Sequence, residues 1–112
     1  MAQEDKKLLL KDLCGRLPYG VKVELHNEVC TLLGYFDDFV MLTSNTPLGQ
    51  QTNIANIKPY LRPMSSMTEE EKWEEQDTVM KFLQDFYNER HLDYRGLIEK
   101  GLALEAPEGM YA

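Results

Sequence analysis

The sequence predicts an α+β domain with an N-terminal helix, a small antiparallel sheet of three to five strands and two C-terminal helices. Apolar residues recur at helical spacing near the N-terminus, alternate with polar residues over positions 21–43, and return to helical spacing after position 67. At 112 residues the chain can bury one hydrophobic core and is too short for two ordinary domains. We expect a single domain over residues 1–112, with the helix and sheet in residues 1–63 and an acidic helical segment in residues 64–112.

The first helix is expected over residues 3–14. Its apolar positions at helical spacing are Leu9, Leu10, Leu13 and Leu17. Gly15 is typical of a residue that ends a helix in the left-handed conformation, and Pro18 prevents continuation.

Three strands are expected at residues 21–25, 29–36 and 39–43. The short polar connections between them, near Asn27 and Asp37, favour hairpins and therefore an antiparallel meander. The middle strand is apolar on both faces, one with Cys30, Leu32 and Phe36 and the other with Val29, Leu33 and Tyr35. Such a strand needs cover on both sides. The N-terminal helix can supply one cover, and curling into a small Src-homology-3-like barrel can supply the other.

The rest of the chain is divided by proline, glycine and capping residues. Residues 44–53 read as a polar loop, and residues 52–61 as a fourth short strand or a helical turn. Thr68 and Glu71 form a capping box that starts a long helix, which is expected to reach Tyr87. Its apolar stripe holds Trp73, Val79, Met80, Leu83, Phe86 and Tyr87, so we expect Trp73 to anchor the helix on the domain. Asp93 caps a shorter helix that Gly101 ends.

Charge is distributed unevenly along the chain. Residues 1–63 hold seven Lys/Arg and seven Asp/Glu, whereas residues 64–112 hold five and twelve, which gives the net charge of −7. Phosphate backbones are bound by basic surfaces, so direct binding of nucleic acid is disfavoured. No apolar run of 18 residues and no signal-like segment is present, which predicts a cytoplasmic protein without membrane contact. Cys14 and Cys30 lack any paired spacing and are expected to be free thiols.

The sequence contains no motif that identifies a candidate residue for catalysis, cofactor binding or metal binding. His26 and His91 lack carboxylate or cysteine neighbours at ligand spacing and are expected in turns or at the surface. The acidic run from Glu69 is explained by the favourable electrostatics of a helix N-terminus. Nucleophile and phosphate-binding motifs are missing from the sequence. We therefore expect no enzyme activity and no cofactor.

Aromatic residues around the sheet are the remaining candidates for function. If the sheet forms a small barrel, its rings can line a groove for a peptide of a partner; otherwise they fill the core. The candidate partner-binding residues are Tyr19, Phe36, Phe39 and Tyr60.

Three stretches of the chain resemble short uncharacterised proteins of gut Bacteroidetes. They are residues 7–23, residues 57–68 (Ile-Lys-Pro-Tyr-Leu-Arg-Pro-Met-Ser-Ser-Met-Thr) and residues 91–111, which begin His-Leu-Asp-Tyr-Arg-Gly-Leu-Ile-Glu-Lys-Gly. Proteins of this family often accompany prophage or other mobile elements. The resemblance implies a genomic setting, and it implies no activity or functional residues.

Three functional hypotheses remain. The first is a non-enzymatic interaction module that binds another cytoplasmic protein, with its own oligomeric state open. The second is an acidic phage-type inhibitor that imitates nucleic acid in the basic groove of a nuclease or regulator. The third is an enzyme whose site carries no known motif and would appear as a deep pocket with convergent polar groups.

Overall fold

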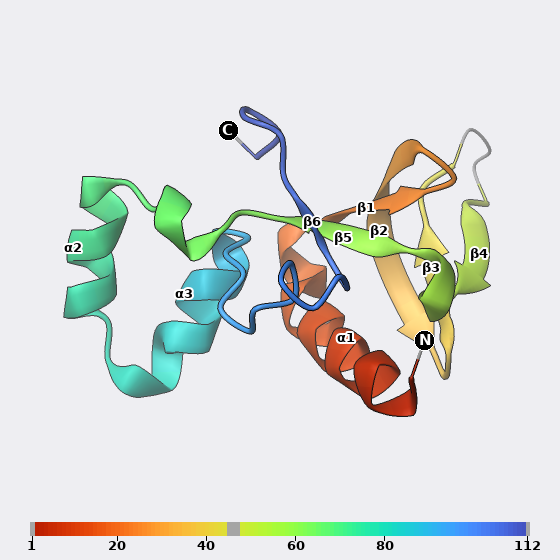
Figure 1. The fold of residues 1–112 in the computed structure, drawn as a ribbon, viewed down its shortest axis with the longest axis horizontal. Helices are drawn as coiled ribbons and strands as arrows, with labels where there is room; N and C mark the ends of the chain where they lie inside the picture. The colour runs from red at the N-terminus through yellow and green to blue at the C-terminus, as the bar shows by residue number, and fades with distance from the viewer. Residues whose placement is uncertain (1, 45–47, 112) are drawn as a thin grey trace.

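The computed structural model describes residues 2–44 and 48–111 and has the predicted α+β class. An N-terminal helix packs on a sheet, and a helical segment extends away from both along the long axis of the molecule (Figure 1). The regular elements are α1 (Gln3–Arg16), β1 (Lys22–Leu25), β2 (Glu28–Phe36), β3 (Phe39–Leu42), β4 (Gln50–Asn53), β5 (Lys58–Leu61), α2 (Glu69–Asp77), α3 (Leu83–Glu89) and β6 (Leu104–Glu105).

Helix α1 forms where it was predicted and buries Leu9 and Leu13, but its predicted end is wrong. The helix continues through Gly15 to Arg16. Gly15 allows close packing there, because a Cβ at this position would lie 2.7 Å from the Asn88 side-chain nitrogen and would displace that side chain. The left-handed residue follows later, at Gly20, where φ is 70°.

The predicted meander is confirmed. β1 pairs antiparallel with β2, and β2 pairs antiparallel with β3. The hairpin turns place His26, Asn27 and Asp37 at positive φ of 50°, 66° and 51°. Asn and Asp are the non-glycine residues that adopt this conformation most readily, which is why these short connections close.

The remaining strands extend the sheet to the order β4-β3-β2-β1-β5-β6. β4 lies at the end of the segment predicted to be a loop, and residues 45–47 of that segment are outside the described residues. The segment 52–61 contains both of its predicted alternatives, a 3₁₀ turn at Ile54–Asn56 and the strand β5. β6 pairs parallel with β5. Within the described residues the sheet remains open, so the barrel closure does not form.

A β-bulge in β2 changes which side chains share a face. The register shifts between Leu32 and Gly34, so that Tyr35 lies opposite the buried Val40 and Phe36 lies opposite Phe39. The side chain of Tyr35 therefore points towards α1, where the neighbouring Cys14 thiol raises the pKa of the tyrosine. The sequence prediction had assigned Phe36 to the face of Cys30 and Leu32, and Tyr35 to the other face. Both assignments are wrong, because strict alternation does not include the extra residue of a bulge.

The core lies between the inner face of the sheet, α1 and the segment around Leu97 and Leu102. It also contains an ion pair, because Arg16 and Asp12 are fully buried and their Nε and Oδ2 atoms are 2.7 Å apart. Arg16 donates in addition to the Leu92 carbonyl, and Arg95 donates to Asp12. These contacts join α1 to the C-terminal part of the chain.

The single long helix predicted after Thr68 is wrong. The capping box of Thr68 and Glu71 forms, but α2 ends at Asp77 and Thr78 is extended, with ψ at 128°. The Thr78 hydroxyl donates to the Glu74 carbonyl, so the side chain satisfies a terminal backbone group and ends the helix. A 3₁₀ turn at Met80–Phe82 then leads into α3.

The prediction of a second C-terminal helix after Asp93 is also wrong, although Asp93 does cap the segment that follows it. The Asp93 carboxylate accepts hydrogen bonds from the backbone N–H groups of Leu97 and Ile98. Residues 94–101 nevertheless form successive turns and no regular helix. The two C-terminal helices of the structure are instead α2 and α3.

Candidate partner-binding surfaces

Two surfaces expose large apolar side chains, and a pocket lies near one of them. The first surface is the outer face of the β2–β3 hairpin, which we call the open face. It comprises Val29, Leu33, Phe36, Phe39 and Met41. Phe36 is 71% exposed and its cross-strand neighbour Phe39 is 42% exposed. Both residues were candidate binding residues from the sequence, and the structure brings them together.

The other two candidate residues lie elsewhere. Tyr19 is in the short 3₁₀ turn after α1, and Tyr60 is on β5; both are partly buried. Tyr60 holds the C-terminal segment, because its carbonyl accepts a hydrogen bond of 2.7 Å from the Tyr111 hydroxyl. The four aromatic residues therefore form no common groove.

The second surface is the segment of residues 69–82, which we call the acidic arm. It holds six Asp/Glu and two lysines. None of the nine residues of α2 is buried. Polar contacts hold the helix instead. Arg62 pairs with Glu71, Arg90 pairs with Glu74, and the Tyr87 hydroxyl donates to Glu75. The predicted anchoring role of Trp73 is wrong, since this side chain is 67% exposed.

The outward side of α2 is built around that indole. Helical spacing places Glu69, Glu70 and Asp77 one turn from Trp73, and all three are exposed. The residues that contact the domain, Glu71 and Glu75, lie on the opposite side of the helix. Beyond the end of α2 the arm exposes three more apolar side chains, Val79, Met80 and Phe82. The arm is therefore an apolar surface with carboxylates around it.

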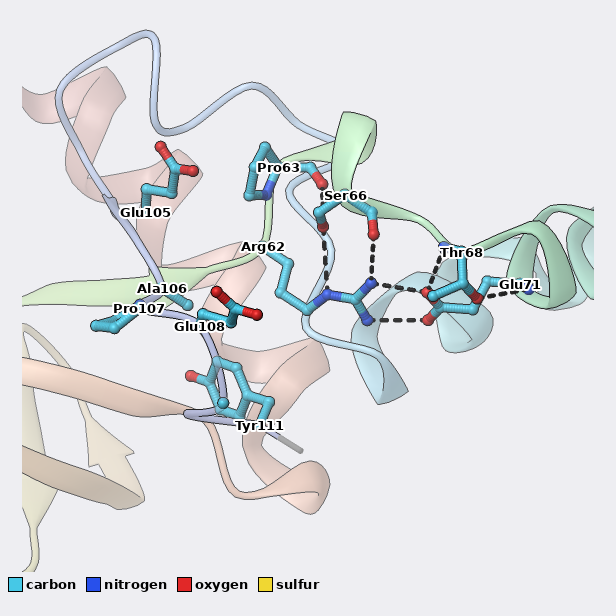
Figure 2. A pocket seen from close by; sticks show the side chains of 11 residues that line it. Arg62, Pro63, Ser66, Thr68, Glu71, Glu105, Ala106, Pro107, Glu108 and Tyr111 are labelled. Carbon is cyan, nitrogen blue, oxygen red and sulfur yellow. Dashed lines mark hydrogen bonds and ion pairs between the residues drawn. The ribbon is translucent and has the colours of Figure 1, made fainter.

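A pocket of about 630 Å³ lies between the base of the arm and the C-terminal segment (Figure 2). Arg62 extends along it and is occupied by protein groups. Its Nη1 and Nη2 donate to the two Glu71 oxygens at 2.9 and 2.7 Å, and Nη2 also donates to the Ser66 carbonyl. Glu105 and Glu108 add two carboxylates to the lining. The pocket is therefore lined by an arginine that is already paired and by further carboxylates.

The ion pair at the pocket shifts the pKa values of both Glu71 and Arg62. Hydrogen bonding from Arg62 lowers the pKa of Glu71 to about 2, with the backbone N–H of Thr68 contributing, and the same carboxylate raises the pKa of Arg62. Glu71 therefore serves both as a cap of α2 and as its main attachment to the domain.

His91 and Tyr111 form a stacked pair beside the pocket, with their ring centroids 3.7 Å apart. The Tyr111 hydroxyl accepts from the Lys22 backbone N–H as well as donating to Tyr60. Burial lowers the pKa of His91 to about 4, and nearby Arg16, Arg62 and Lys22 add to this effect. The sequence prediction of a turn position for His91 is correct, with φ at 59°. Its packing role was not predicted, because it depends on Tyr111, 20 residues away.

The described residues contain no metal-binding cluster and no membrane-spanning helix. In residues 2–44 and 48–111 no group of three His, Cys, Asp or Glu side chains is placed to hold a metal ion. None of the helices in these residues has the length and apolar character needed to cross a membrane. Cys14 and Cys30 are free thiols, and Cys30 is buried.

Comparison of the chain with protein-family models, curated proteins and solved structures finds no match. The two exposed surfaces are therefore the features of this chain that bear on its function.

Sequence patterns identified two of the five residues of the open face and did not identify the arm as a surface. Phe36 and Phe39 border the Asp37-Asp38 turn, and this position at a hairpin end was the available signal. The apolar stripe of the expected long helix was misleading, since Trp73 and Met80 fall on one side only if the helix is continuous. The break at Thr78 removes that continuity.

Proposed function

We propose that this protein is a non-enzymatic interaction module of the cytoplasm and that the acidic arm is its binding element. The observation that carries the proposal is the composition of α2, a helix that buries none of its own residues and displays the only tryptophan of the chain. A helix in a globular domain is normally stabilised by burying an apolar face. Exposed indoles surrounded by polar groups are typical of protein-binding hot spots.

The arm specifies the chemistry of the partner. Trp73 requires an apolar pocket, and the carboxylates of Glu69, Glu70 and Asp77 require lysine or arginine around it. Val79, Met80 and Phe82 extend the apolar contact along the arm. The proposed partner is therefore a cytoplasmic protein with an apolar groove whose rim is basic.

The second hypothesis, an inhibitor that imitates nucleic acid, predicts a different surface. Four of the six acids of the arm have partners within the chain: Glu71, Glu74 and Glu75 are engaged by Arg62, Arg90 and Tyr87, and Glu69 forms an exposed pair with Lys72. The remaining carboxylates surround an indole. This arrangement favours a protein groove with an apolar centre over a site that normally binds phosphates.

Affinity capture with matched baits tests the proposal. The wild-type chain and the Trp73→Ser and Phe36→Ser variants are used as baits in a lysate of a gut Bacteroidetes species. Phe36 is the matched control because its exposure, 71%, is close to the 67% of Trp73. We expect a protein that the wild type and the Phe36→Ser variant retain and the Trp73→Ser variant loses. Circular dichroism of each bait checks that it is folded.

The captured protein is then purified and titrated against the chain. Tryptophan emission of the chain should shift to shorter wavelength as the indole leaves water, if the partner's own emission is subtracted. Binding should weaken with added salt, and in the triple variant Glu69→Gln, Glu70→Gln, Asp77→Asn. Duplex DNA should compete if the groove is one that normally binds nucleic acid, and this outcome would support the inhibitor hypothesis. Equal capture by the wild-type and Trp73→Ser baits would contradict the proposal.

A further inference from the structure

We infer that the open face is a self-association surface, on which a second copy of this chain packs face to face across a two-fold axis. The inference concerns a different surface from the acidic arm and is independent of the proposed function. It is carried by the shape of the face and by the signs of the charges at its border.

The open face gathers apolar side chains from both strands of the β2–β3 hairpin. The register places Phe36 beside Phe39 and Gly34 beside Met41, while the bulge residue Leu33 lies next to Gly34. A Cβ at Gly34 would meet no atom within 4 Å, so the space above this glycine is open. An apolar side chain of an opposing sheet can occupy this open space, and sheets that pack face to face interlock in this way.

The border of the open face carries both signs of charge. On the adjacent strand β1, Lys22 and Glu24 alternate with the buried Val23, so both lie on the outer side. In the sheet register Glu24 is also beside Lys58 of β5. On the other side, β4 contributes the uncharged Gln51 and Asn53, opposite Met41 and Phe39.

A border with both signs is complementary to itself. In a two-fold interface the same patch is present on both subunits, so residue i of one copy meets residue j of the other and the reverse. Lys22 of one copy can then lie near Glu24 of the second. The acidic arm lacks this property, because two copies would bring carboxylates of one sign together. A second copy can therefore bind at the open face, whereas two arms would repel each other.

The arms stay accessible in such a dimer. α2 lies at one end of the long axis and the β2–β3 hairpin lies at the other (Figure 1). Packing through the hairpins leaves both arms at the outer ends of the assembly.

Sedimentation equilibrium from low to high micromolar concentration tests the inference. We expect the wild type to show a monomer–dimer equilibrium. The Phe36→Ser variant should raise the dimer dissociation constant by about tenfold or more, since it removes the most exposed apolar side chain of the open face. The Trp73→Ser variant should leave the constant unchanged. A wild-type chain that remains monomeric throughout, or a dimer lost in Trp73→Ser, would overturn the inference.

Charge reversal at the border tests the two-fold arrangement. Lys22→Glu leaves the border of β1 with one sign and should weaken the dimer. Lys22→Glu combined with Glu24→Lys restores both signs and should restore association. If Lys22→Glu alone has no effect, or if the double variant is as weak as the single one, the pairing across the axis is wrong. Circular dichroism confirms that each variant is folded.

Discussion

The sheet half of the molecule and the acidic arm each expose an aromatic side chain to a similar extent, yet their surroundings differ. Phe36 lies among apolar residues in a half of the chain whose charges cancel. Trp73 lies among carboxylates in the half that carries the whole net charge. Exposure alone therefore does not define a binding surface. The charges around an exposed ring decide which partner can approach it.

The two regions also differ in how they are held. Apolar burial around Leu9, Val23 and Leu61 holds the sheet half together. Ion pairs and hydrogen bonds of Glu71, Glu74 and Glu75 hold α2. We therefore expect substitutions and pH to act on the two regions in different ways.

The largest effect is expected at the polar contact inside the sheet half. Asp12→Ala leaves Arg16 fully buried without its carboxylate and should lower the free energy of unfolding by about 3–5 kcal/mol. Denaturant melts measure the loss. Lys11→Ala, one residue away and exposed, is the control and should change the value by less than about 0.5 kcal/mol. A loss below about 1 kcal/mol for Asp12→Ala would show that apolar burial alone holds this region.

Acid should destabilise the molecule through His91. Its pKa is 6.5 in the unfolded chain and about 4 when folded, so between these values the unfolded state binds the additional proton. Stability should therefore be complete above pH 6.5 and fall as the pH decreases towards 4, by at most about 3 kcal/mol before screening by solvent is considered. Melts of the wild type and of His91→Asn across this range measure it, and the variant should show the smaller slope. Equal slopes would contradict the assignment.

Release of the arm should be local. Glu71→Gln weakens the contact with Arg62 and one half of the capping box, for a local cost of about 1–2 kcal/mol. Amide hydrogen exchange should become faster in α2 and stay unchanged in β1–β3. Glu70→Gln, on the outward side, is the matched control.

The same local loss should occur in acid. Because the pKa of Glu71 is lowered from 4.5 to about 2, its contribution is present above pH 4.5 and disappears as the pH falls towards 2. Faster exchange of the sheet amides in Glu71→Gln would show that the arm and the sheet unfold together.

The smallest effect on stability is expected at Trp73. Trp73→Ala should change the free energy of unfolding by no more than about 0.5 kcal/mol, because the side chain is mostly in water. Acrylamide should quench the wild-type emission efficiently in the isolated monomer. Truncation of a buried tryptophan costs about 3 kcal/mol or more. A loss of that size would mean that the arm packs on the domain.

Sequence patterns predicted the elements that depend on local signals. The hairpins at Asn27 and Asp37, the capping box of Thr68 and the α1 helix are all encoded within a few residues. Phe36 and Phe39 flank the two-residue turn that determines their pairing, although strict alternation had assigned Phe36 to the face of Cys30 and Leu32.

Features that depend on distant contacts were not predictable in this way. An Asp12–Arg16 pair at i, i+4 looks the same on a solvated helix as in a core, and the distant contacts with Leu92 and Arg95 distinguish the two. The end of α2 was missed because Thr78 is neither glycine nor proline. The parallel pairing of β6 with β5 joins residues more than 40 positions apart and leaves no local pattern.

The bulge in β2 gives the open face one more residue than a regular strand would supply. Deleting Leu33 would leave Leu32 opposite Leu42 and Gly34 opposite Met41 in a regular ladder, so residues 34–36 would keep their present faces. The open face would lose one apolar side chain and would otherwise be unchanged. Relatives without this residue would therefore present nearly the same surface, and alignments of β2 should place the gap at the bulge.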